Sequence, residues 1–109
     1  MPRHSAPIPV LTYGEGTHDI SVPVRAYIQA IGTANITLTA SAGNLVTIAT
    51  MDASKITLTG VCAELHIQLA TGSSTIDTRL LDAGYISFGQ LGTAVNLLLT
   101  TGQRVTFMP

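Results

Sequence analysis

The stretches Ile36-Thr37-Leu38-Thr39 and Ile56-Thr57-Leu58-Thr59 repeat one tetrapeptide, and Ile86-Ser87-Phe88 is a variant of it further along the chain. In each stretch an apolar residue occupies every second position, and another apolar residue follows nine positions after the isoleucine. Strict alternation of this kind is typical of a short strand with one buried face. The pattern therefore predicts a chain built from half-buried strands.

The same alternation extends outward in both directions from these stretches. Between the alternating runs lie short segments rich in Gly, Ser, Asn and Asp, which favour turns. No segment of the chain has convincing helical spacing of its apolar residues. We therefore predict an all-β protein. The predicted strands lie near residues 20–29, 34–39, 45–49, 55–59, 64–70, 75–80, 85–88, 94–100 and 104–108.

The even spacing of the strand centres fits two architectures. One is an antiparallel β-sandwich or jelly-roll-like barrel with tight turns. The alternative is a β-solenoid in which each strand and its turn form one side of a coil. The interval from Ile36 to Ile56 is shorter than that from Ile56 to Ile86, whereas a solenoid favours a constant period. On this ground the sandwich or barrel is the preferred prediction.

The N-terminal residues differ in composition from the rest of the chain. Several prolines and the Gly14-Glu15-Gly16 segment disfavour regular ladder pairing. We expect residues 1–19 to form an extended N-terminal arm that lies on a surface of its own subunit or of a neighbour. Residues 20–109 are then a single all-β domain.

Composition limits the classes of function. The chain has 109 residues, of which only 10% are charged, and none is charged between Arg25 and Asp52. An ordinary soluble domain has about 25% charged residues, so the uncharged surface predicts oligomerisation or docking on a larger assembly. The net charge of −1 gives no basic footprint for nucleic acid, and no apolar run approaches the length of a membrane span. The first residues also lack the features of a secretion signal.

No arrangement of residues predicts an enzyme. Cys62, between Val61 and Ala63, is expected to be a small apolar core residue. His66 alternates with apolar residues and is expected to face solvent or a partner. Asp77 and Arg79 share a strand face and are expected to form an ion pair. We predict no catalytic residues, no cofactor and no metal site.

Two segments carry a resemblance to a known class of proteins. Residues 19–28 (Asp-Ile-Ser-Val-Pro-Val-Arg-Ala-Tyr-Ile) and 33–48 (Thr-Ala-Asn-Ile-Thr-Leu-Thr-Ala-Ser-Ala-Gly-Asn-Leu-Val-Thr-Ile) resemble a short module of tailed-phage virion proteins. Residues 70–76 (Ala-Thr-Gly-Ser-Ser-Thr-Ile) are similar to the turn that follows in those proteins. The resemblance covers roughly residues 19–80. The repeated Ile-Thr-Leu-Thr strands also resemble bacterial adhesin-like surface domains.

The resemblance implies a virion structural protein, made in the host cytoplasm. A capsid decoration (cement) protein that forms a homo-oligomer, expected to be a trimer, and stabilises the phage particle is the first expectation. A tail or spike-base structural protein, or an adhesin-like or carbohydrate-binding β domain, is the alternative. The expected partners are the protein itself and a major capsid or tail protein, with no nucleic acid and no membrane. The expected contact residues are Pro7, Pro9, Tyr13, Arg25 and Tyr27.

Overall fold

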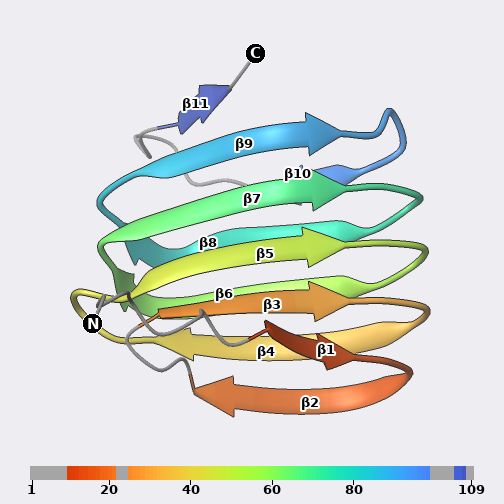
Figure 1. Cartoon of the computed structure of the whole chain (residues 1–109), viewed down its shortest axis with the longest axis horizontal. Coiled ribbons are helices and arrows are strands. Elements are labelled where there is room, and N and C mark those ends of the chain that lie inside the picture. The colour runs from red at the N-terminus through yellow and green to blue at the C-terminus, as the bar shows by residue number, and fades with distance from the viewer. Residues whose placement is uncertain (1–9, 22–24, 99–104, 108–109) are drawn as a thin grey trace, which may run out of the picture.

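The computed structural model describes residues 10–21, 25–98 and 105–107, and the regular structure within them is β-strand throughout. The strands wind as a coil and alternate between two facing parallel sheets (Figure 1). Sheet A contains, in order, β1 (Val10–Tyr13), β3 (Arg25–Ala30), β5 (Leu45–Thr50), β7 (Glu64–Ala70), β9 (Ile86–Leu91) and β11 (Val105–Phe107). Sheet B contains β10 (Asn96–Leu98), β8 (Thr75–Ala83), β6 (Lys55–Cys62), β4 (Ala34–Ala40) and β2 (Gly16–Ser21). The fold is a β-solenoid.

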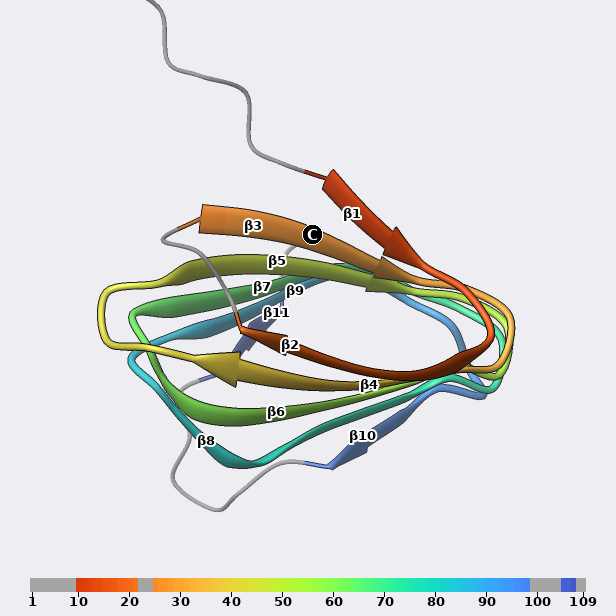
Figure 2. The same cartoon turned by 90° about the horizontal axis from the view of Figure 1, so that it is seen from below.

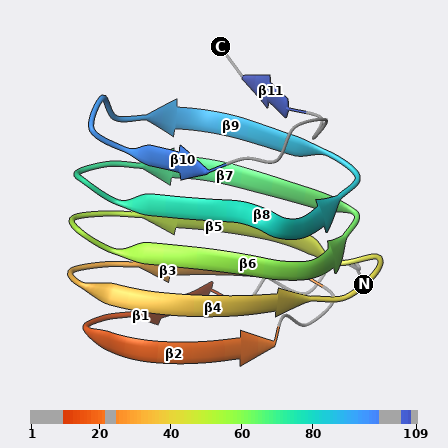
Figure 3. The ribbon, with the colours of Figure 1, turned by 180° about the vertical axis from the view of Figure 1, so that it is seen from behind.

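Each coil of the solenoid contributes one strand to each sheet. Arg25 pairs with Leu45 in sheet A, and Ile36 pairs with Ile56 in sheet B. Figure 2 shows the two sheets as opposite sides of a flattened tube, and Figure 3 shows the strands of sheet B stacked from β2 to β10. Residues one coil apart therefore lie side by side on neighbouring strands.

The core consists of aliphatic rows that run across the strands inside the tube. In sheet B, Ile36, Ile56 and Ile76 lie in register and are 0% exposed. The corresponding row of sheet A contains Ile28, Ile48, Ile67 and Phe88, all 0% exposed. Full burial of such a side chain contributes roughly 1.5–3 kcal/mol. The alternating apolar residues of the sequence thus form one continuous core.

Small hydroxyl residues occupy inward positions where the chain turns from sheet A to sheet B. The Ser54 hydroxyl donates to the Met51 carbonyl at 2.7 Å, and the Ser74 hydroxyl donates to the Thr71 carbonyl at 2.9 Å. The Thr50 hydroxyl lies 2.8 Å from the Ser74 hydroxyl. Buried polar groups need such partners, and these bonds supply them at successive coils. The turns are therefore tied to one another as well as to the sheets.

The preferred prediction of an antiparallel sandwich or barrel is wrong, because all the sheet pairings of the described strands are parallel. Ile56 and Ile86 are not equivalent positions of the repeat, because they belong to different sheets. The structural equivalent of Ile56 in the next coil is Ile76, just as Ile56 is the equivalent of Ile36. The period is thus nearly constant within each sheet, as the solenoid alternative requires.

The N-terminal region also differs from expectation. Residues 1–9 lie outside the described part of the chain. Residues 10–13 and 16–21 form strands β1 and β2, one in each sheet, where an arm separate from the sheets was expected. The strand expected over residues 20–29 is divided between β2, which ends at Ser21, and β3, which begins at Arg25.

Candidate functional site

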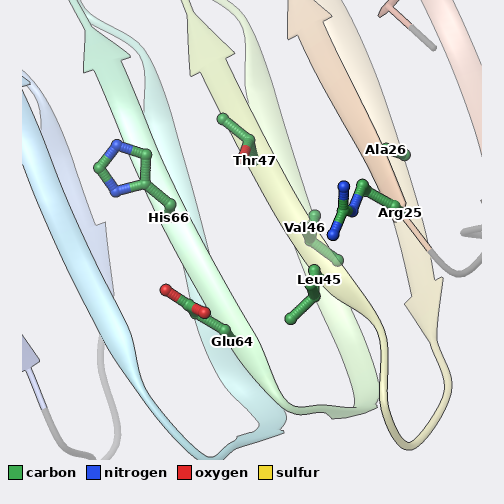
Figure 4. Close-up of a pocket in the computed structure, with 7 residues that line it drawn as sticks. All are labelled: Arg25, Ala26, Leu45, Val46, Thr47, Glu64 and His66. Atoms are coloured by element: carbon green, nitrogen blue, oxygen red, sulfur yellow. The ribbon is translucent and has the colours of Figure 1, made fainter. Parts of the chain in front are cut away.

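A shallow depression on the outer face of sheet A is the candidate site (Figure 4). Its volume is about 210 Å³, and it spans β3, β5 and β7. Ala26 and Val46 are buried in the core, so their backbone lines the depression. The complete lining is Arg25, Ala26, Leu45, Val46, Thr47, Glu64 and His66.

The parallel ladders hold the outward-facing side chains around the depression in two rows. Neighbouring strands of a sheet lie about 4.8 Å apart, so the outer members of each row are about 10 Å apart. The first row is Arg25, Leu45 and Glu64, and the second is Tyr27, Thr47 and His66. The backbone of a regular sheet thus places these six residues as one group.

The two charged side chains lie at opposite ends of the first row. Arg25 comes from β3 and extends toward β5, whereas Glu64 comes from β7 and extends toward β9, away from Leu45 (Figure 4). Leu45 lies between them, and no described residue forms an ion pair with either one. The depression therefore has a cationic end at Arg25 and an apolar floor at Leu45, and the carboxylate of Glu64 lies at the rim on β7.

His66 is held in place from the far side of the depression. Its Nδ1 lies 2.7 Å from the hydroxyl oxygen of Ser87 on β9. A hydrogen bond at one ring nitrogen fixes the orientation of the imidazole and leaves the other nitrogen for a further partner. Within the described residues, Nε2 has no hydrogen-bond partner, and it is available to a ligand.

The structure places the expected contact residues in three different environments. Arg25 and Tyr27 share the outer face of sheet A, two positions apart on β3. Tyr13 is the last residue of β1, and its side chain packs against the core. Its ring centroid lies 5.0 Å from that of His18. Pro7 and Pro9 lie outside the described residues.

Sequence reasoning missed Leu45, Thr47 and Glu64 as parts of a site, and it treated His66 only as a surface residue. Their signal is the coil period, because Leu45 and Thr47 lie one coil beyond Arg25 and Tyr27. Once the sheets were assumed to be antiparallel, this offset carried no meaning. The solenoid register brings together residues that are distant in sequence.

The outer face of sheet B offers a second surface. Thr39 and Thr59 lie in register with their hydroxyls 3.4 Å apart, and Leu80 continues the same row. Leu80 is 69% exposed and Val61, two residues after Thr59, is 44% exposed. We call Thr39, Thr59, Val61 and Leu80 the uncharged strip.

The expected ion pair between Asp77 and Arg79 is confirmed at the edge of this face. The Arg79 guanidinium donates to the Asp77 carboxylate through Nε at 3.0 Å and Nη2 at 2.9 Å. These hydrogen bonds hold the pKa of Asp77 below its usual value. Asp77 pairs with Thr57 directly before a β-bulge, where the register of β6 with β8 shifts, so the ion pair is a structural feature of this irregularity.

The expected burial of Cys62 is also confirmed, since its side chain is 2% exposed. Burial raises the pKa of its thiol to about 11, and the negative charge of Asp82 contributes to the rise. Since the thiolate is the reactive form, this thiol is chemically quiet at neutral pH.

Within the part of the chain that the structure describes, no group of three or more His, Cys, Asp and Glu side chains is placed to hold a metal ion. The same residues contain no helix that is long and apolar enough to cross a membrane. The chain matches no family model, no curated protein and no solved structure.

Proposed function

We propose that the protein is a structural subunit of a larger assembly, a virion component that oligomerises and stabilises a phage particle as a capsid decoration (cement) protein. A tail or spike-base position is a variant of the same proposal. The resemblance of residues 19–80 to tailed-phage virion proteins supports this class. The observation that carries the proposal is the uncharged strip on sheet B.

The uncharged strip has the properties of an interface. Leu80 and Val61 project from the outer face of sheet B, and their exposed fractions are among the largest of the described apolar side chains. Covering apolar surface is favourable by about 25 cal/mol per Å². Strands that are already paired in a sheet also dock without losing much backbone freedom, which lowers the entropic cost of association. A partner that covers this strip therefore gains free energy from residues that are already in place.

Native mass spectrometry of the full chain and two variants tests this proposal. We expect the wild-type protein to form a closed oligomer, with a trimer as the specific expectation, and Leu80→Glu to be monomeric because it buries a charge in the interface. Val10→Glu is the control, since Val10 is 57% exposed but lies on the outer face of sheet A. A wild-type protein that remains monomeric at high concentration, or a Leu80→Glu oligomer, would contradict the proposal.

The alternative function is that of an adhesin-like or carbohydrate-binding domain. It is favoured by the depression of sheet A, whose lining includes the polar residues Arg25, Thr47, Glu64 and His66 together with Leu45. This surface lies on the opposite face from the uncharged strip, so the two functions are compatible in one subunit.

A further inference from the structure

We infer that the depression on sheet A binds one acidic sugar ring, a uronate or sialate unit of a glycan. This inference rests on the alternative function above and names its ligand class. It depends on four properties of the depression, namely its size, its mixed polarity, its apolar floor and the state of Arg25.

Size and shape suit a single ring. The volume of about 210 Å³ accommodates one pyranose, and the depression is open on the outer face of a flat sheet. An open site of this kind leaves the rest of a polymer in solvent. The geometry therefore fits one unit of an oligosaccharide better than an enclosed small molecule.

The polar groups around the depression include both donors and acceptors. Arg25 supplies only donors, Glu64 as a carboxylate supplies only acceptors, and the Thr47 hydroxyl supplies both. The His66 ring extends toward β9, where Nδ1 contacts Ser87, so its free Nε2 adds a fourth group at the rim of the depression. A sugar hydroxyl donates and accepts at once, so a ring of hydroxyls needs this mixture of partners.

The floor of the depression is apolar at its centre. Leu45 lies between Arg25 and Glu64 in the first row, and Ala26 and Val46 complete the apolar part of the lining. The C–H face of a pyranose is apolar, whereas its rim is polar. An aliphatic centre with a polar rim complements that distribution, as ligand sites commonly do.

Arg25 selects for a carboxylate. The other described arginine, Arg79, is held by the carboxylate of Asp77 at 2.9 Å, whereas no described carboxylate pairs with Arg25. Glu64 lies two strands away across Leu45. A guanidinium presents a planar fork that binds a carboxylate through two parallel hydrogen bonds. A sugar carboxylate at this end places the ring over Leu45, with its hydroxyls beside Thr47 and toward the rim that Glu64 and His66 form on β7.

Chemical-shift titration of the isotopically labelled full chain by NMR tests the inference at fixed ionic strength. The probes are D-glucuronate and N-acetylneuraminate, with D-glucose as the neutral sugar and acetate as the carboxylate alone. We expect shifts of the amides of Arg25, Thr47 and His66 with an acidic sugar. We also expect the acidic sugar to bind at least tenfold more tightly than either glucose or acetate.

Three variants assign the binding to the depression. Arg25→Ala should weaken the binding of the acidic sugar at least tenfold, and Arg25→Lys should give an intermediate loss because it retains charge without the fork. Lys55→Ala is the matched control, since it removes one exposed cation from the outer face of sheet B and should leave affinity unchanged. Arg25 is exposed, and a dispersed amide spectrum of each variant verifies its fold.

The outcomes separate the inference from the function on which it rests. Binding of glucose as tight as that of glucuronate would overturn the acidic class but leave a carbohydrate function. Equal affinity for acetate and glucuronate would show that the sugar ring contributes nothing to binding. It would overturn the acidic-sugar assignment and leave only an anion contact. No shift with any of the sugars would overturn both the inference and the carbohydrate-binding alternative, while the proposed structural role would be unaffected.

Discussion

At the residue scale, one backbone conformation recurs where the chain passes from sheet A to sheet B. Gly32, Asp52 and Gly72 occupy this turn in successive coils with φ of 64°, 58° and 68°. Asp52 is the only one of these three residues that is not a glycine, and its Oδ2 accepts a hydrogen bond from the Gly32 amide at 3.0 Å. Asp tolerates the left-handed region better than most residues because its short polar side chain bonds locally. Each turn thereby supports the turn of the preceding coil.

Substituting the two glycines separates backbone strain from packing. Gly32→Ala should lower the free energy of unfolding by about 1 kcal/mol, the cost of the left-handed conformation for an L-residue. Gly72→Ala should lower it by about 3 kcal/mol, because overpacking adds to that strain. An added Cβ at Gly72 would lie 2.6 Å from the Asp52 carbonyl oxygen, whereas at Gly32 it would meet no described atom within 4 Å beyond the adjacent residues. Urea unfolding of both variants measures the difference, and equal losses would contradict the stacked-turn geometry.

The Asp77–Arg79 pair makes part of the stability depend on pH. Hydrogen bonds from Arg79 lower the pKa of Asp77 in the folded protein, so the unfolded chain binds this proton more readily. The contribution is therefore fully present above the unfolded value of about 3.9 and is lost as the pH falls through the lower folded pKa. Thermal unfolding measured across this acid range should show that Arg79→Gln loses less stability on acidification than the wild-type protein does. Asp82→Asn, which removes an exposed carboxylate of the same strand, should retain the acid loss associated with Asp77.

At the element scale, the alternating pattern could be read from the sequence but the pairing of the strands could not. Seven of the predicted strands overlap β4 to β10 within a few residues, because alternation and turn residues are local signals. Parallel and antiparallel strands share the same two-residue period, so alternation does not identify a strand's neighbour. That information lay in the equal spacing of Ile36, Ile56 and Ile76. Ile86, by contrast, lies in sheet A and does not belong to this series.

The coil as a repeating element leads to an insertion experiment. Duplicating residues 35–54 should add one complete coil, because position 35 pairs with position 55 in the native register. The stability of a solenoid is approximately a sum over repeats and their interfaces, so the longer protein should melt at or above the wild-type temperature.

Duplicating only residues 35–44 is the matched control. Half a coil of extra chain would move each following strand to the opposite sheet, and this variant should melt well below the wild type. Circular dichroism on heating compares the two. A destabilised full-coil duplication beside a stable half-coil duplication would contradict the two-strand coil.

At the scale of the whole molecule, the two proposed functions lie on the outer faces of the two sheets. The sequence predicted the residues of these faces only in part. The low content of charged residues indicated a surface that a partner covers, and Arg25 and Tyr27 share an outer face. Thr47 and His66 complete that group only through the register of β5 and β7. The uncharged strip depends in the same way on the register of β6 with β8. Contacts between coils could not be inferred while the strand order was unknown.

The most direct test of this account is intrachain thiol cross-linking, because both faces depend on the coil. Thr37→Cys with Thr57→Cys places two thiols on Cα partners of sheet B, whereas Thr39→Cys with Thr47→Cys places them on opposite sheets. Cys62 is buried and its thiol pKa is about 11, so it should not react. With dibromobimane, which fluoresces on bridging two nearby thiols, the parallel register predicts efficient cross-linking of the 37/57 pair and none of the 39/47 pair. Cross-linking of 39/47 but not 37/57, as in an antiparallel hairpin, would contradict it.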